Sequence, residues 1–325
     1  MQNILRNILR IGLPLVLGGA ILWWMYRGFR WDEVREAVSV DMRWGWMVAS
    51  LPFGVLAQVF RGLRWRQMLL PLGERVSRWS CVRAVFLSYA SSLVVPRVGE
   101  LLRCGVLARD ANAKVSRSLG TVVTERVVDI VLILMLTVLT VALQVPFFVR
   151  FMGSTGFSLQ GMAERFTPAG WWVTVVCGMV AVATGGLLLR RFRVFEKSRR
   201  MTGELIDGLL SIRRVERKGL FWFYSLGIWV AYFLHFYLTF FCFAQTATLG
   251  LTAALIAFVV GTFAVLVPTP NGAGPWHFAV KTVLVLYGVA GTTGALFVLV
   301  VHSIQTLLVA VLGLVGLYPG KKRKL

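Results

Sequence analysis

The sequence predicts an all-α polytopic membrane protein, and three observations carry this prediction. Hydrophobic residues make up 57% of the 325 positions and charged residues only 15%, with a mean hydropathy of +0.73, whereas a soluble domain has about 25% charged residues. The charges lie in blocks that separate long apolar stretches. Most of these stretches reach the roughly 17–25 residues that a helix needs to cross a bilayer. So apolar a chain cannot be disordered, and four cysteines without paired spacing exclude a disulfide scaffold.

The long apolar stretches lie at 11–26, 44–60, 119–143, 170–189, 220–245, 250–267 and 293–317. The first one follows Arg6 and Arg10, and the apolar run continues past Gly18-Gly19-Ala20 instead of ending at a cleavage site. We therefore expect an uncleaved anchor that forms the first span. Two further apolar segments, 84–96 and 278–290, would extend only about 20 Å as helices, which is too short to cross a bilayer alone.

The distribution of basic residues predicts the orientation. Lys and Arg exceed Asp and Glu by 35 to 14, and the excess concentrates before the first span, at 61–83, at 190–218 and in the tail 321–324. The cytoplasmic loops of membrane proteins are enriched in Lys and Arg. We therefore expect these regions and both termini in the cytoplasm, with 27–43 and 144–169 outside. Topology accounts for the net charge of +21, and we expect no nucleic-acid partner.

Parity then constrains the short segments. The connection near 246 is expected outside and the tail inside, so an odd number of crossings separates them. We interpret 250–267 and 278–290 as a helical hairpin that enters from outside and returns, and 84–96 and 97–115 as one that enters from the cytoplasm. Two full crossings for each pair satisfy the same parity. The hairpin interpretation predicts about six full spans plus two re-entrant helical hairpins.

The same order of elements occurs twice. The span 44–60 corresponds to 220–240, Pro96 to Pro268, and the span 119–143 to 293–317, at a common offset of about 175 residues. Each half has an odd number of crossings, so the second half would be inverted relative to the first, as in secondary transporters. We expect a single transmembrane domain, 1–325, with inverted repeats 1–150 and 165–320, although no residue identity supports the repeat.

The tip of the first hairpin and the span after it hold polar and charged groups at membrane depth. Ser88, Ser91 and Ser92 share one helical face, and Pro96 and Gly99 break the helix and free backbone groups. Ionisable residues at membrane depth are functional candidates, and here they are Arg97, Glu100, Arg103, Glu125, Arg126 and Asp129. An alternative places the turn 125–129 at the cytoplasmic end of the span, because 130–149 alone is long enough to cross.

The tip of the second hairpin is rich in proline and glycine and carries one titratable side chain. Such a sequence cannot continue a helix through the apolar stretch that it interrupts. The candidates here are Pro268, Pro270, Asn271, Gly272, Gly274 and His277.

These motifs resemble a known family. The pattern Pro96-Arg97-x-Gly99-Glu100-x-x-Arg103 after a serine-rich short helix, then Glu125-Arg126-x-x-Asp129, then a Pro/Gly-rich tip before a final span, is similar to the lysylphosphatidylglycerol synthase transmembrane-region family, also called flippase-like domain proteins. The resemblance covers nearly the whole chain. Many members have Pro-Gly-Gly-x-Gly-x-x-Glu at the second tip, where this sequence has His277 in place of the carboxylate. A soluble synthase domain follows in the best-known members; this chain ends at Leu325, so synthase activity is not implied.

The resemblance implies a lipid flippase in the cytoplasmic (inner) membrane of a bacterium, with membrane lipids as its partners. The headgroup would lie in a polar cavity between the two hairpin tips, where the arginines bind phosphate and the carboxylates balance them or carry a proton. The alternative is a non-transporting accessory or scaffold protein of a lipid or glycolipid pathway. A solute transporter shares the architecture. An intramembrane transferase would use His235, His277 or His302 as its base, but no second catalytic group lies at a recognisable spacing, so we do not expect an enzyme. The sequence has no metal-site or cofactor motif, and we expect neither.

Overall fold

The computed structural model describes residues 16, 18–27, 42–95, 98–155, 203, 206–208, 210–267 and 269–318, and within these the side chains of all but 145–155. Every regular element in this part of the chain is a helix, as the composition predicts. The polar tip residues Pro96, Arg97 and Pro268 lie outside the described residues, as does the predicted span 170–189.

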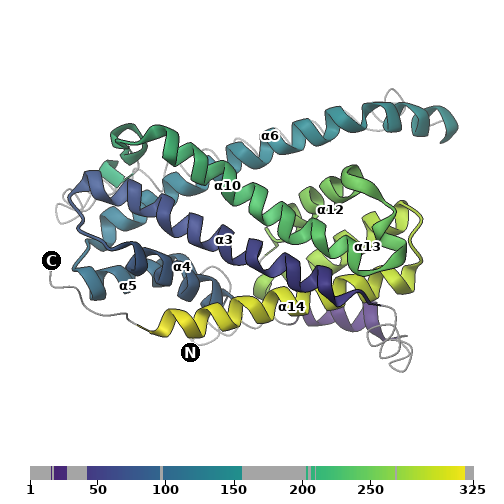
Figure 1. Ribbon diagram of the computed structural model, residues 1–325, viewed down its shortest axis with the longest axis horizontal. Coiled ribbons are helices and arrows are strands. Elements are labelled where there is room, and N and C mark those ends of the chain that lie inside the picture. The colour runs from purple at the N-terminus through teal and green to yellow at the C-terminus, as the bar shows by residue number, and fades with distance from the viewer. Residues whose placement is uncertain are drawn as a thin grey trace, which may run out of the picture.

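Four long helices form the frame: α3 (Trp44–Leu69), α6 (Val115–Thr155), α10 (Lys218–Tyr237) and α14 (Gly291–Leu317). A 3-10 turn, Leu238–Cys242, extends α10, and the single turn α11 (Ala244–Ala247) follows. Figure 1 shows α3, α10 and α14 running along the long axis. All four are long and apolar enough to cross a membrane, which confirms a multi-pass membrane protein. The predicted first span is helical at 18–26, where it is described.

Helix α3 extends further than the sequence analysis expects. The apolar stretch ends at 60 because Arg61 follows it, and 61–83 counts there as a cytoplasmic connection. In the structure α3 runs through Arg61 and Arg64 to Leu69 and gives way to the 3-10 turn Leu70–Leu72. Both arginine side chains are buried. A prediction from hydropathy alone ends the span at such arginines. In the folded protein, carboxylates on α6 pair with them, so α3 continues past Arg61.

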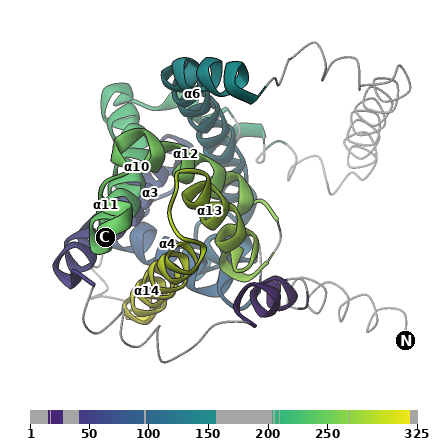
Figure 2. The same ribbon diagram turned by 90° about the vertical axis from the view of Figure 1, so that its right-hand side faces the viewer.

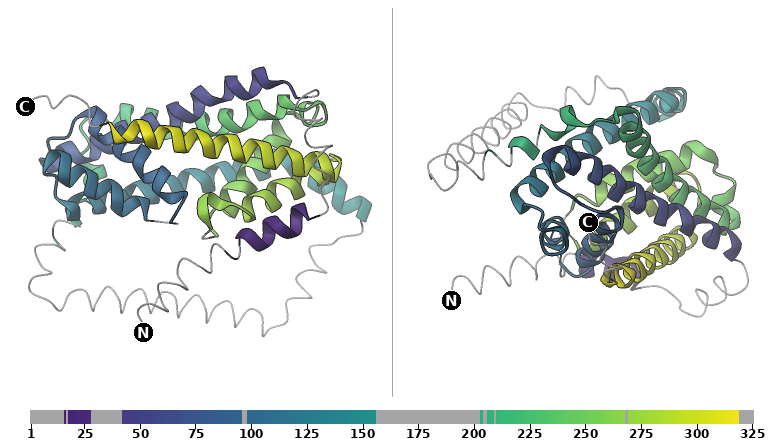
Figure 3. Two further views of the ribbon diagram at one scale, coloured as in Figure 1. Left: turned by 90° about the horizontal axis from the view of Figure 1, so that it is seen from below. Right: turned by 60° about the vertical axis from the view of Figure 1, so that its left-hand side comes forward.

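Two pairs of short helices complete the fold. α4 (Arg78–Ser92) packs on α5 (Gly99–Ala111), and α12 (Gly250–Ala264) packs on α13 (Pro275–Leu286). Helices α4 and α12 have 15 residues each, or about 22 Å, against a hydrocarbon core of about 30 Å. In Figure 3 (left) the two pairs lie at opposite ends of α14. That each pair enters and leaves the membrane on one side stays a prediction.

The order of elements repeats, since α3, α4, α5 and α6 are followed by α10, α12, α13 and α14 in the same arrangement of long and short helices. Figure 2 looks along the long axis and shows α12 and α13 between α10, α6 and α14. This order and the opposite placement of the short pairs are what an inverted repeat requires. The repeat itself stays a prediction.

The buried core differs in chemistry from one end to the other. Around α12 and α13 the core is aromatic, and the ring centroid of Phe240 lies 5.3 Å from the ring centroids of Phe236 and Phe297. Around α4 and α5 it is mainly aliphatic and surrounds the buried Trp65 and Leu107. Among the described residues, the buried Arg, Asp and Glu side chains lie in or beside α3, α4, α5 and α6, next to this second, aliphatic part.

Candidate functional site

The carboxylates predicted on 119–143 meet two arginines of α3. Asp129 accepts a hydrogen bond from Arg61 Nη1 at 2.7 Å through Oδ2, and its Oδ1 lies 2.8 Å from Arg64 Nη1. Glu125, one turn earlier on α6, has Oε1 3.4 Å from Arg64 Nε. Residues three apart on α3 and four apart on α6 share one helical face, so the two pairs face each other across the helix contact.

The first short-helix pair adds two more charged residues through α5. Arg103 Nη2 lies 2.7 Å from Glu125 Oε2, and Arg126 Nε donates to Glu100 Oε1. Arg126 Nη1 also lies 3.8 Å from Asp129 Oδ2. We call this set the charge cluster; it consists of Arg61, Arg64, Glu100, Arg103, Glu125, Arg126 and Asp129.

The charge cluster is enclosed by protein except at one edge. The side chains of Arg64 and Glu125 are 0% exposed and that of Arg103 is 2% exposed. The side chains of Arg126 and Glu100 are 42% and 39% exposed. Glu125 lies about three turns into α6 and is enclosed by neighbouring helices. The Arg126–Glu100 pair is therefore the edge from which a ligand can reach the cluster.

Aromatic rings and hydroxyl groups hold the buried guanidinium groups in place. The Arg103 guanidinium lies over the Trp65 ring, 4.7 Å from its centroid, and Trp65 Nε1 donates to Thr121 Oγ1 at 2.8 Å. Arg61 lies 5.9 Å from the centroids of both Tyr89 and Tyr232. Such cation–π contacts favour a desolvated arginine and restrict where its N–H groups point.

Positive charge exceeds negative charge within the cluster, because four arginines meet three carboxylates. In addition, Arg61 Nε and Arg64 Nη2 are buried without a hydrogen-bond partner. Buried charge without a counter-charge is unfavourable. The surplus and the unused N–H donors suit an anion with several acceptor oxygens, which arginine binds in bidentate fashion.

The serines predicted at the first tip form hydrogen bonds within their own helix. Ser91 Oγ and Ser92 Oγ donate to the Ser88 carbonyl at 2.8 and 3.0 Å. Gly99, at the start of α5, lies so close to Ser88 that a Cβ there would overlap the Ser88 carbonyl oxygen. The Ser88 carbonyl is thus the point where α4 and α5 cross, and Gly99 permits their approach.

The second tip has no charged side chain among its described residues. Pro270–Gly272 forms a 3-10 turn in which Asn271 has a φ of 50°, and Gly272 and Gly274 have φ of 75° and 91°. Asn271 Nδ2 donates to Thr306 Oγ1 of α14 at 2.8 Å. This hydrogen bond fixes the turn against the last long helix.

His277, in the first turn of α13, lies among aromatic and imidazole rings. The Gly274 N–H donates to His277 Nδ1 at 3.4 Å. The His277 ring lies 4.5 Å from that of His302 and 6.3 Å from that of Tyr26. The structure thus brings together Glu100, Arg103, Glu125, Arg126 and Asp129 at the first tip. The described candidates of the second tip contact α14, the helical segment 18–26 and their own turn.

Sequence reasoning missed Arg61 and Arg64, as well as the neighbouring Tyr89 and Tyr232. A signal for the arginines exists in the spacing of Gln58, Arg61 and Arg64, which recur every third residue and extend one polar face out of the apolar run. The two tyrosines carry no comparable signal, because they come from α4 and α10 and meet only in the folded chain: Tyr232 Oη donates to Tyr89 Oη at 3.1 Å.

Residues 11–313 match the family model described as the lysylphosphatidylglycerol synthase TM region. The chain belongs to this family. No curated protein and no solved structure matches the chain significantly. The match confirms the resemblance drawn from the tip motifs, and it extends over both short-helix pairs and the charge cluster. As a member of the lysylphosphatidylglycerol synthase TM family, the protein is an integral multi-pass membrane protein with a membrane-lipid-related role.

Proposed function

We propose that the protein is a lipid flippase, which moves a phospholipid or a lipid-linked headgroup across the cytoplasmic membrane while the acyl chains stay in lipid. The headgroup would pass through a polar cavity between the two short-helix pairs. Membership in the lysylphosphatidylglycerol synthase TM family supports a lipid as substrate. The placement of the two pairs at opposite ends of the bundle suits entry from one side and exit on the other.

The observation that carries the proposal is the surplus arginine of the charge cluster together with its exposed edge. A phosphate group that reaches Arg126 meets the one guanidinium of the charge cluster that is nearly half exposed, since those of Arg61, Arg64 and Arg103 are buried. Glu100 accepts from Arg126 Nε, so a phosphate group would either use the remaining N–H groups of this guanidinium or displace Glu100. A displaced Glu100 would be free to meet a cationic headgroup or to take up a proton. A phosphate near Asp129 would be repelled unless Arg61 and Arg64 stay paired with that carboxylate.

The second tip would receive the headgroup on the other side. Its hydrogen-bonding side chains are neutral, namely the amide of Asn271 and the imidazole of His277, while the N–H groups of Gly272 and Gly274 already donate to the Thr269 carbonyl and to His277 Nδ1. A neutral tip binds the headgroup more weakly than the arginine cluster does. Weaker binding on one side favours release there, so the asymmetry itself serves transport.

A reconstitution assay tests the proposal. The purified chain is placed in vesicles with a fluorescent lipid whose label is quenched only in the outer leaflet, and lipids with anionic, aminoacylated and polyprenyl headgroups are compared. We expect transfer above protein-free vesicles for at least one class. R126Q should slow transfer by at least about tenfold, because an arginine–phosphate contact is lost.

The matched control is R109Q, which removes an arginine of α5 whose side chain is 72% exposed and outside the charge cluster. We expect wild-type transfer from it. Absence of transfer with every lipid class would contradict the flippase assignment. Wild-type function in cells with both R126Q and E100Q would instead favour the accessory or scaffold role, in which the charge cluster has no part in moving lipid.

A further inference from the structure

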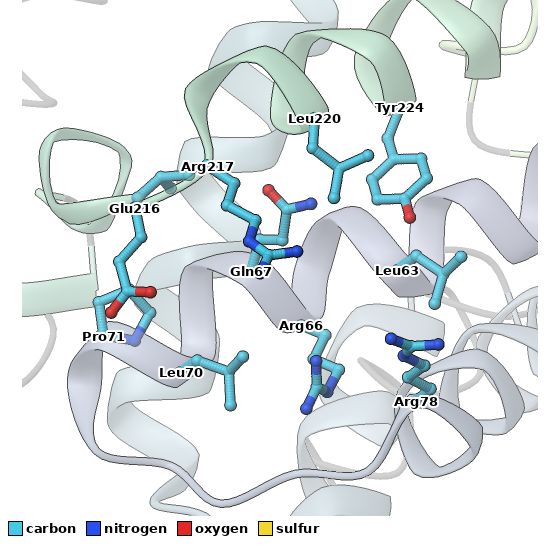
Figure 4. Close-up of a pocket in the computed structure, with 11 residues that line it drawn as sticks. Leu63, Arg66, Gln67, Leu70, Pro71, Arg78, Glu216, Arg217, Leu220 and Tyr224 are labelled. Atoms are coloured by element: carbon cyan, nitrogen blue, oxygen red, sulfur yellow. The ribbon is translucent and has the colours of Figure 1, made fainter.

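A pocket of about 380 Å³ lies apart from the charge cluster, at the end of the bundle where α3 ends and α10 begins. Figure 4 shows its walls, which come from α3 and the 3-10 turn after it, from the start of α4, and from α10 and the turn before it. Among the residues that line it are Arg66, Gln67, Arg78, Arg217 and Tyr224. The pattern of basic residues assigns this end of the bundle to the cytoplasm.

Three arginines from three separate segments line this pocket. Arg66 belongs to α3, Arg78 is the first residue of α4, and Arg217 directly precedes α10. Arg66 Nε donates to the Val76 carbonyl at 2.9 Å, which fixes its side chain. Within the described residues, Arg78 and Arg217 form no ion pair, and the acid Glu216 lies on the Pro71 side of the pocket in Figure 4. The pocket therefore carries net positive charge.

Unused hydrogen-bonding capacity accompanies this charge. The side-chain amide of Gln67 has its nitrogen and its oxygen buried, and neither has a partner in the structure. Helices α4 and α10 both begin at the pocket, at Arg78 and Lys218, and the N-terminus of a helix attracts anions. Guanidinium groups, an amide N–H and two helix N-termini together suit a compact anion with several oxygens, which describes a phosphate group.

The remaining wall of the pocket is apolar. Leu63 of α3 and Leu70 of the 3-10 turn after it line one side, and Leu220 and Tyr224 of α10 line the other. Both helices are long and apolar enough to cross the membrane, and Leu70 is 41% exposed at the pocket. An apolar wall next to a basic one matches a molecule that has a phosphate group at one end and acyl chains at the other.

We infer that this pocket is a binding site for a phosphate group, carried by an anionic phospholipid of the adjacent leaflet or by free phosphate. A ligand there contacts α3, α4 and α10 at once and so joins the first short-helix pair to two long helices. The site is separate from the path proposed for the transported lipid, and binding to it requires no transport.

Equilibrium binding to the full chain in neutral detergent tests the inference, with radiolabelled phosphatidylglycerol and radiolabelled phosphate as probes. Phosphatidylcholine serves as a zwitterionic competitor, in which a choline cation offsets the charge of the phosphate group. We expect saturable binding of at least one probe to the wild type. The double variant R78Q/R217Q should bind at least about tenfold more weakly, since two charge-assisted contacts are lost. The control R75Q/R213Q removes two exposed arginines near the same segments that do not line the pocket, and it should bind within about twofold of the wild type.

Two arms identify the source of the phosphate group. The site is assigned to lipid if phosphatidylglycerol binds tightly and neither phosphatidylcholine nor millimolar potassium phosphate displaces it. The site is assigned to the free anion if phosphate itself binds tightly. Three results overturn the inference: no binding of either probe to the wild type, unchanged binding to R78Q/R217Q, or an equal loss in both double variants. Thermal midpoints and elution profiles verify that both double variants fold; because all four arginines are surface residues with no ion pair among the described residues, we expect no shift.

Discussion

The two pairs of short helices occupy equivalent places in the order of elements but are stabilised by different interactions. Beside α4 and α5, Glu125 lies between Arg64 and Arg103 in a fully buried network. Beside α12 and α13, rings pack on rings, as Trp276 does on Phe236 at 6.1 Å between centroids. Removing one partner of a buried ion pair costs about 3–5 kcal/mol, whereas an aromatic pair contributes about 0.5–1.5 kcal/mol beyond its burial.

This difference indicates that the two halves have separate roles even if their backbones are repeats. In the first half, a few buried charges that neutralise one another contribute much of the stability, and the function proposed above uses the same charges to bind a phosphate group. The second half distributes its stability over many small contacts and keeps its tip neutral. A single substitution in the buried ion-pair network of the first half should therefore lower the free energy of unfolding more than a single substitution in the aromatic core of the second half.

The largest effect is expected from E125Q, which keeps the side-chain shape and removes the charge. Arg64 and Arg103 both lose their counter-charge in a site from which water is excluded, so the free energy of unfolding should fall by about 3–5 kcal/mol. The thermal midpoint of the purified protein in detergent measures the loss. The control D207N removes an exposed carboxylate that pairs with Arg214 at 3.1 Å and should change stability by less than about 1 kcal/mol. Equal stability of the two variants would mean that Glu125 carries no charge in the folded protein.

The next largest effect is expected from G99A, which places a methyl group against the Ser88 carbonyl where α4 and α5 cross. Backbone on both sides must move apart, at a cost of about 1–3 kcal/mol. G105A on the same helix has open space around it and should stabilise slightly, by about 0.5–1 kcal/mol. G261A in α12 meets the Trp276 side chain at 2.9 Å and should fall between the two, because a side chain yields more easily than backbone. A G99A protein as stable as G105A would contradict the close crossing.

Most of the fold follows from local properties of the sequence. The spans at 119–143 and 293–317 are predicted by the length of their apolar runs, and the short pairs by runs that end too early to cross. The extension of α3 to Leu69 could not be predicted in this way. It depends on Arg61 and Arg64 meeting Glu125 and Asp129 on α6, and a contact between distant segments leaves no trace in hydropathy.

The part of the charge cluster that could be predicted from the sequence consists of its ionisable residues at membrane depth. Arg103, Glu125 and Asp129 stand out as ionisable residues in or beside apolar runs, and the structure brings them together. Ser91 and Ser92 could not be interpreted in this way. Their spacing predicts on which face the hydroxyl groups lie, but it does not show that both hydroxyl groups donate to the Ser88 carbonyl, about one turn earlier.

A smaller effect is expected at the second tip. N271A removes the hydrogen bond to Thr306 and leaves a residue with a Cβ at a φ of 50°, so stability should fall by about 1–2 kcal/mol. N271G also loses the hydrogen bond but adopts this φ without strain, and its loss should be about half as large or less. Thermal midpoints of both variants decide the matter: equal losses would assign the whole effect to the hydrogen bond and none to the backbone.

The smallest effect is expected where the two halves meet. Tyr232 of α10 donates to Tyr89 of α4 at 3.1 Å, and both rings face Arg61. Y232F keeps the ring and its attraction for the guanidinium and removes only the hydroxyl, so the cost should be about 0.5–1.5 kcal/mol. A double-mutant cycle with Y89F isolates the pair: if the hydroxyl groups bond chiefly to each other, the double variant should be little less stable than either single one. Additive losses would mean that each hydroxyl has its own separate partner, and the two halves would then be joined at this point through Arg61 alone.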